Sequence, residues 1–156
     1  MIRAGVLFVS LLSVGTPAYC PPAENVPTVW IHVSDPRFVA PVKYRAWIMK
    51  YAAQFGVPLD VAIRLGFEES GWNESAMSRN RNRTYDHGLY QLNSAYHRVM
   101  LTEANIRDGL AYWAQCWRAT GSVRRATVAY MAGIMGEKHA PKSTRREAAA
   151  VAGGGM

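Results

Sequence analysis

Apolar residues recur at helical spacing along four stretches of the chain. The first stretch follows Pro41, a residue suited to the first position of a helix, and it ends at Gly56, where a C-terminal cap belongs. Its apolar positions repeat at intervals of three and four residues: Tyr44, Trp47, Ile48, Tyr51, Ala52 and Phe55. This spacing predicts an amphipathic helix over residues 41–55.

A second helix is predicted to begin near Pro58 and to end with two adjacent glutamates. At about 100° per residue, Glu68 falls on a charged stripe with Asp60 and Arg64. Glu69 falls near the border of the face formed by Leu59, Ala62, Ile63, Gly66 and Ser70. We therefore expect Glu68 on the surface and Glu69 against packed neighbours, which desolvate its carboxyl group and raise its pKa.

Residues 71–93 are polar and predict a loop region with hairpin character around residues 84–90. Ser94 is placed to cap a short helix through Met100. Two longer helices follow Thr102 and Ser122, because apolar residues again recur at helical spacing. The whole pattern predicts a mainly α-helical domain with a small loop or β-hairpin region.

The two ends of the chain differ from this central part. Residues 1–18 combine a short positive start, an apolar run and small residues at the end, which is typical of a secretory signal peptide. The apolar run is too short to cross ~30 Å of hydrocarbon, and an uncleaved anchor is the alternative. A proline-rich extended lead-in is predicted over residues 19–40, the folded domain over 41–136, and a disordered basic tail over 137–156. The protein is thus expected to be periplasmic or secreted, with no stable membrane anchor after cleavage.

The net charge of +7 favours an anionic partner: nucleic acid, a membrane surface or an acidic wall polymer. No basic run is interleaved with aromatic residues, so nucleic acid is not expected as a partner. Of the two cysteines, Cys20 could form a disulfide with Cys116 if signal cleavage leaves it in the mature chain. Cleavage after Cys20 would instead leave Cys116 as a single buried thiol.

The candidate chemistry lies in the polar region and the helix before it. Glu69 meets the sequence requirement for a general acid, and Asp86 follows 17 residues later in a polar loop where it could stay ionised. Glycoside hydrolysis uses two carboxyl groups in different environments, although a helix-end glutamate and a turn aspartate are also common structural residues. His32, His97 and His139 have no metal-ligand spacing and no phosphate-binding loop is present, so no metal or other cofactor is expected.

Three short motifs carry a resemblance to a known family. They are Glu69-Ser70 at the helix end, Gly88-Leu89-Tyr90-Gln91 after the polar loop, and Ala129-Tyr130-Met131-Ala132-Gly133 in the last helix. In this order they resemble the soluble lytic transglycosylase (SLT) domains of the lysozyme-like superfamily. The resemblance covers roughly residues 42–135. It implies a mainly α, α+β lysozyme-like fold, with the loop or hairpin region beside a catalytic cleft.

The same stretch is similar to c-type lysozymes, in which Asp86 would match the second catalytic carboxylate. The resemblances imply that Glu69 protonates the glycosidic oxygen between N-acetylmuramic acid (MurNAc) and N-acetylglucosamine (GlcNAc). A transglycosylase would then form a 1,6-anhydro sugar, whereas a hydrolytic muramidase would use Asp86 and water. Substrate-binding positions are implied at Ser70, Ser78, Asn80, Gln91, Asn93 and Tyr130.

Met131 departs from the family pattern, which usually has Asn after the tyrosine of the last motif. This departure keeps open a non-catalytic, peptidoglycan-binding scaffold as a further alternative. The short chain resembles the specialised transglycosylases of secretion, pilus or conjugation machines, whose components would then be partners. The expected protein is a monomer whose substrate is the peptidoglycan glycan strand.

Overall fold

A computed structural model describes residues 38–97 and 101–153, and these form a helical domain with one small sheet. The signal peptide, most of the predicted lead-in and Cys20 lie outside the described residues. Along the chain, the elements are α1 (Val42–Phe55), α2 (Leu59–Ser70), β1 (Met77–Arg79), β2 (Tyr85–His87), β3 (Leu92–Asn93), α3 (Thr102–Thr120), α4 (Val123–Ala132), the 3-10 helix η2 (Ile134–His139) and α5 (Lys142–Val151). The expected mainly α fold with a small β region is confirmed.

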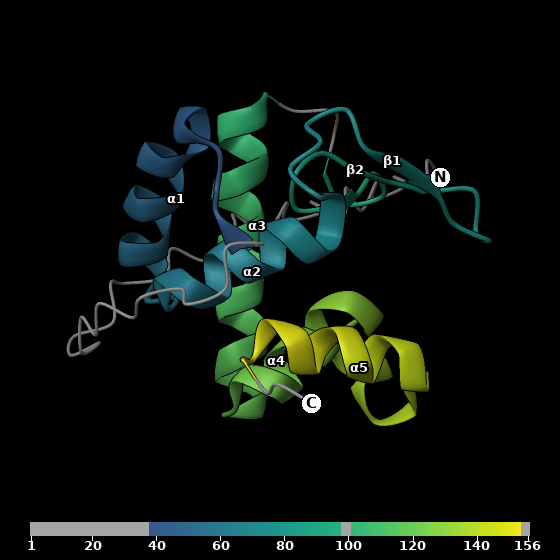
Figure 1. The fold of residues 1–156 in the computed structure, drawn as a ribbon. Coiled ribbons are helices and arrows are strands. Elements are labelled where there is room, and N and C mark those ends of the chain that lie inside the picture. Colours follow the sequence, from purple (N-terminus) through teal and green to yellow (C-terminus); the bar gives the residue numbers. More distant parts are fainter. Residues whose placement is uncertain (1–37, 98–100, 154–156) are drawn as a thin grey trace, which may run out of the picture.

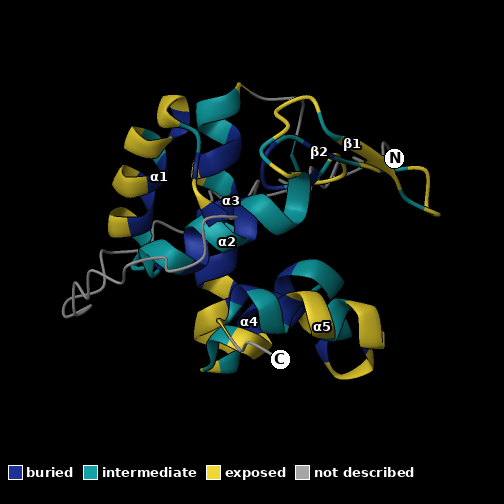
Figure 2. Cartoon of the chain, viewed as in Figure 1, coloured by how far each residue is buried: buried dark blue, intermediate teal, exposed yellow. Residues whose placement is uncertain are grey.

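Helix α3 is the central element, with α1 along one side of it and α4 against its C-terminal half (Figure 1). Helix α2 crosses the same region and ends beside the sheet, while α4 and α5 lie below it in this view. The core contains large side chains from each of these helices: Tyr44, Ile48, Leu65, Ile106, Leu110, Trp113, Tyr130 and Val151. The exposed residues of α1 lie on its outer side, as Figure 2 shows.

The predicted helix ends agree closely with the structure. The first helix starts one residue after Pro41, and Gly56 takes the left-handed conformation that ends it, at φ 70°. Gly121 ends α3 in the same way, and the Ser122 hydroxyl accepts a hydrogen bond from the Arg125 amide at the start of α4. The helix ends predicted at Gly56, Gly121 and Ser122 are thus confirmed.

The sheet has three antiparallel strands in the order β1-β2-β3. The hairpin character predicted around residues 84–90 corresponds to β2 paired with β3, although β3 begins just beyond that range. Strand β1 was not predicted. Over residues 94–97 the predicted short helix is absent: residues 94–96 form a turn, and the Ser94 hydroxyl accepts a hydrogen bond from the Tyr85 amide. That bond ties the turn to β2, so the side chain is not available as a helix cap. Residues 98–100 of the predicted helix lie outside the described residues.

The predicted disordered tail is wrong for residues 137–153. Helix α5 packs against both α2 and α4, and Ala148 and Val151 are buried. The boundary expected at residue 136 is therefore too early. The charged stripe predicted on α2 is wrong for the same reason, because Arg64 donates a hydrogen bond to the Ala150 carbonyl and is half-buried under α5.

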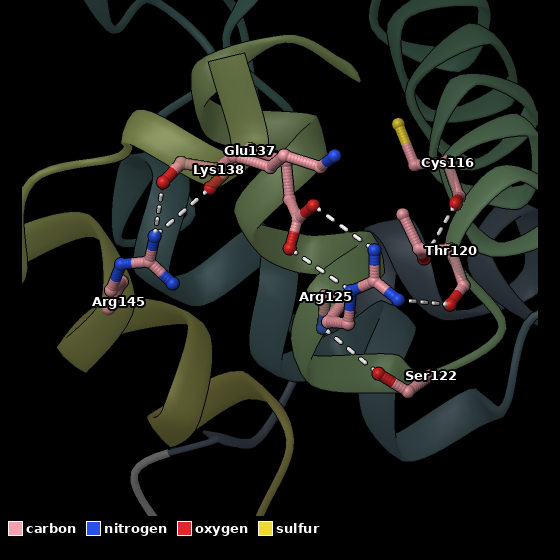
Figure 3. A network of polar contacts seen from close by, with 7 residues as sticks. All are labelled: Cys116, Thr120, Ser122, Arg125, Glu137, Lys138 and Arg145. Atoms are coloured by element: carbon pink, nitrogen blue, oxygen red, sulfur yellow. Dashed lines mark hydrogen bonds and ion pairs between the residues drawn. The ribbon is translucent and has the colours of Figure 1, made fainter. Parts of the chain in front are cut away.

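A polar network holds the segment between α4 and α5 (Figure 3). The Arg125 guanidinium donates to both carboxylate oxygens of Glu137, at 3.1 and 3.2 Å, and to the Thr120 carbonyl at 3.2 Å. Arg145, on α5, donates to the carbonyls of Glu137 and Lys138. The hydrogen bonds from Arg125 hold the pKa of Glu137 below its ordinary value.

Among the described residues, no helix is long and apolar enough to span a membrane.

Docking of α5 predicts that its buried face contributes to stability. Val151 is fully buried in the main core, so Val151→Ala is expected to lower the free energy of unfolding by about 1–3 kcal/mol through lost apolar burial and the cavity left behind. The exposed Arg146 on the same helix is the matched control, and Arg146→Ala should change stability by less than about 0.5 kcal/mol. Urea unfolding followed by circular dichroism measures both. Equal, near-zero effects would show that α5 does not dock.

Candidate active site

A cleft of about 1140 Å³ is lined by most of the candidate residues. The α2 side contributes Glu68 and Glu69, and the sheet and its loops contribute a polar wall that includes Asp86. The other side is formed by α3, by α4 with η2, and by α5. The remaining lining residues that bear on the chemistry are Asn80, Arg81, Gln91, Asn93, His97, Tyr112, Tyr130, Met131, Thr144 and Glu147.

Glu69 is the penultimate residue of α2, and it faces into this cleft. Helix α2 ends immediately afterwards, since Gly71 and Trp72 both have positive φ, at 59° and 66°. The Glu69 Oε1 atom is buried and has no hydrogen-bond partner among the described residues. Burial, the largest cause, raises the pKa of Glu69 to about 8, and the negative charges of Asp86, Glu147 and Glu68 add to the effect. This carboxyl group therefore carries a proton at neutral pH.

Two buried tyrosines connect α4 to the first half of α2. The Tyr130 hydroxyl, on α4, donates a hydrogen bond to the Tyr90 carbonyl, and the Tyr90 hydroxyl donates to the Ala62 carbonyl on α2. Glycines allow this close packing. A Cβ at Gly66 would lie 2.7 Å from the Trp72 ring, and one at Gly109 would lie 2.5 Å from the Tyr90 Cβ. Tyr130 thus lines the cleft and also connects α4 to the helix that carries Glu69.

Asp86 lies on β2 in a polar setting. Its half-buried carboxylate accepts a hydrogen bond of 2.8 Å from the Asn93 amide, on the neighbouring strand β3. Asn93 also donates to the Thr84 hydroxyl, which in turn accepts a hydrogen bond from Asn80. The predicted contrast between a desolvated carboxyl group at Glu69 and a hydrogen-bonded, polar setting for Asp86 is therefore present in the structure, and both residues line the same cleft.

Gln91 lines the cleft, but its amide is engaged by its own loop. Its Nε2 donates to the carbonyls of Gly88 and Ala76, and its Oε1 accepts a hydrogen bond from the Ser78 hydroxyl. Ser78 itself is exposed on β1 and lies outside the cleft lining. Ser70 also lies outside it, and its hydroxyl donates to the Gly66 carbonyl at 3.1 Å. Of the six predicted binding residues, the structure brings Asn80, Gln91, Asn93 and Tyr130 into the cleft.

Several lining residues were missed by the sequence analysis. Glu68, expected on the surface, is half-buried and lines the cleft beside Glu69. Thr144 and Glu147 come from α5, which was expected to be disordered. Helix α3 contributes Tyr112, whose ring lies 5.1 Å from that of Tyr130. The helix-favouring run from Thr144 to Val151 was the available signal for α5, but only two of its residues are fully buried.

The part of the chain that the structure describes holds no group of three His, Cys, Asp or Glu side chains placed to bind a metal ion. Cys116 is fully buried, and burial raises the pKa of its thiol to about 11. Whether it pairs with Cys20 stays a prediction, because Cys20 lies outside the described residues.

The raised pKa of Glu69 predicts a pH-dependent cost in stability. The folded state keeps the proton up to about pH 8, whereas the unfolded chain loses it near 4.5, so this group destabilises the fold progressively as pH rises between these values. Glu69→Gln should therefore raise the free energy of unfolding by on the order of 2–4 kcal/mol at pH 8.5, and by little at pH 4.5. Thermal or urea unfolding at both pH values tests this, and an equal effect at both would contradict it.

Comparison with known protein families identifies the domain that carries this cleft. The family described as the transglycosylase SLT domain matches residues 46–151, which include α2, the sheet, α3, α4 and α5. No curated protein sequence matches the chain. The family match covers well over half of the chain and supports lytic transglycosylase-type cleavage of peptidoglycan. The chain belongs to the transglycosylase SLT domain family.

Proposed function

We propose that the protein is a peptidoglycan lytic transglycosylase that cleaves the β-1,4 bond between MurNAc and GlcNAc and forms 1,6-anhydro-MurNAc. The observation that supports this most is the buried carboxyl group of Glu69, whose pKa is raised to about 8 at the edge of a large cleft. A general acid must hold its proton at the working pH and release it to a leaving group. Glu69 meets both requirements.

Glu69 acts twice in the proposed reaction. Its proton moves to the glycosidic oxygen as the bond between that oxygen and C1 of MurNAc breaks. The Glu69 carboxylate then takes the proton of the MurNAc 6-hydroxyl as O6 bonds to C1. The carboxyl group is protonated again at the end, and no water is consumed.

The walls of the cleft suit a sugar polymer. The sheet side presents Asn80, Asp86 and Asn93, whose polar groups can bind hydroxyl and acetamido groups. The opposite side presents the aromatic rings of Tyr112 and Tyr130 together with Met131, which suit the less polar faces of the sugar rings. Met131 supplies no amide, so an acetamido group next to it would be bound by other lining residues, such as those of the sheet side or Gln115 on α3.

A hydrolytic muramidase is the second candidate function, and the placement of Asp86 favours it. Asp86 lines the same cleft as Glu69 and is held by Asn93, so it could stabilise or capture the oxocarbenium-like carbon before water attacks. The two functions share the first step and differ in the group that attacks C1. A non-catalytic scaffold remains the third candidate, because of Met131.

The biological setting is part of the same proposal. The proposed setting is a periplasmic or secreted, monomeric enzyme that makes local openings in the wall for a secretion, pilus or conjugation machine. The net charge of +7 supports an acidic wall polymer as its substrate. Nucleic acid is not proposed as a partner.

Substitution of the two adjacent glutamates of α2 tests the mechanism. Glu69→Gln should reduce peptidoglycan solubilisation by about 10²–10⁴-fold, because the general acid and base is lost. Glu68→Gln is the matched control at the adjacent glutamate and should cost less than about 10-fold. An unchanged rate in Glu69→Gln would overturn the proposal.

The product class separates the transglycosylase from the hydrolase. Mass spectrometry of the released muropeptides should show 1,6-anhydro ends, and these should persist in Asp86→Asn, which can still accept the hydrogen bond from Asn93. Reducing ends, lost together with activity in Asp86→Asn, would identify a muramidase. A protein that binds peptidoglycan and releases no product would be a scaffold.

The rate should depend on pH in a defined direction. Because the protonated form of Glu69 begins the reaction, kcat/KM should fall as pH rises through about 8, the raised pKa of this carboxyl group. The measurement is the initial rate of release of soluble fragments between pH 5 and 10. A decline centred near the ordinary glutamate value of 4.5 would show that Glu69 does not act as the proton donor.

A further inference from the structure

Helix α5 is fixed against the helix that carries Glu69. Ala148 and Val151 on its inner side are buried, and the Arg64 guanidinium of α2 donates to the Ala150 carbonyl at 3.4 Å. Helix α5 also contacts α4, and Arg145 anchors it to the end of η2. The side of α5 that faces the cleft is therefore held in a defined position relative to α2.

Two residues one turn apart, Thr144 and Glu147, line the cleft from α5. The Glu147 side chain is exposed to the solvent in the cleft. Among the described residues it forms no hydrogen bond or ion pair, so no basic side chain there neutralises its charge directly. Its carboxylate acts on its surroundings through its charge.

The groups that surround Glu69 come from several elements. Glu68 lies on α2 itself, Asp86 on β2, Glu147 on α5, and Tyr130 on α4 is close enough to interact with Glu69 electrostatically. The other titratable or charged lining residues come from the loops around the sheet and from α3: Arg81, Tyr96, His97 and Tyr112. Arg81 is the one Lys or Arg in this lining. The immediate surroundings of Glu69 are thus acidic in a chain that is basic as a whole.

We propose that Glu147 is a positioning residue for the reaction proposed above: its carboxylate, presented by α5, keeps Glu69 in its proton-carrying form. A second negative charge next to a like charge is unfavourable, so Glu147 disfavours loss of the Glu69 proton. Burial of Glu69 and the charge of Asp86 contribute more to its raised pKa, and Glu147 ranks above Glu68. Asp86 is also proposed to act on the substrate, whereas Glu147 acts through Glu69.

This role explains why the C-terminal helix belongs to the active site. Helix α5 closes one side of the cleft and supplies a charge that α2 alone does not place there. Because Glu147 is exposed, water and salt screen this charge, and its effect is smaller than that of burial. The inference depends on the proposed function for its role in the reaction, but the electrostatic effect itself can be measured without substrate.

Titration of Glu69 in the full protein is the direct test. The Glu69 carboxyl carbon is followed by NMR in protein labelled with 13C-glutamate, and its signal is assigned by its loss in Glu69→Gln. In Glu147→Gln the pKa of Glu69 should fall by about 0.2–0.7 unit at low salt, and in Glu147→Lys by about twice as much. These differences should shrink at 1 M salt, where the screening length is about 3 Å.

Arg146 supplies the matched control, because it is exposed on the same helix and lies outside the cleft lining. Arg146→Gln should leave the titration of Glu69 within about 0.1 unit of its original position. Thermal unfolding of each variant shows whether α5 still docks. A Glu147→Gln protein that folds normally but leaves the titration unmoved, or moves it upward, would overturn the proposal.

The pH dependence of the rate completes the test. In Glu147→Gln the decline of kcat/KM at alkaline pH should begin at lower pH by the same interval as the titration shift, with a nearly unchanged rate at pH 6. A purely structural role for Glu147 would lower the rate at every pH and leave the profile in place. A protein that shows the titration shift but cleaves no peptidoglycan would keep the electrostatic role of Glu147 and overturn the proposed function.

Discussion

The proposed chemistry depends on the burial of one carboxyl group. Water would ionise Glu69 at neutral pH, and it would then have no proton to donate. The fold excludes that water from the Glu69 Oε1 atom, which is buried. The Tyr90 hydroxyl ties the first half of α2 to the segment between β2 and β3, and the Tyr130 hydroxyl ties α4 to the same segment. Gly66 and Gly109 leave room for Trp72 and Tyr90, and a larger side chain at either glycine would clash with one of these rings.

The cleft around Glu69 is acidic, whereas the chain as a whole is basic. The two charges act on different groups. The net charge of +7 acts over a distance and favours approach to an acidic polymer. Inside the cleft, Glu68, Asp86 and Glu147 surround Glu69 and favour its neutral form. If basic residues lined this part of the cleft instead, they would improve attraction of the polymer but would lower the pKa of Glu69, the proposed general acid. Separating the two charges in space avoids this conflict.

Local signals in the sequence were sufficient for most of the helices and for Glu69, but not for α5. Proline and glycine mark the ends of α1, and the border position of Glu69 on its helix already indicated burial. The sequence of α5 is basic and rich in alanine, so its composition resembles that of a solvated tail. Only Ala148 and Val151 are buried in it, and two small side chains give a weak periodic signal. Its position depends on long-range contacts with α2 and α4, which a local pattern cannot reveal.

The same long-range contacts explain why the assignment of surface residues on α2 failed. A helical wheel can show which residues share a face, but it cannot show how many faces will be covered. Helix α2 is covered on two sides, by the core at Leu65 and by α5 at Arg64. Helix α2 keeps this position although burial of the Glu69 carboxyl group disfavours its charged form. The raised pKa of Glu69 therefore depends on the long-range contacts that place α2, and a local pattern in the sequence does not contain them.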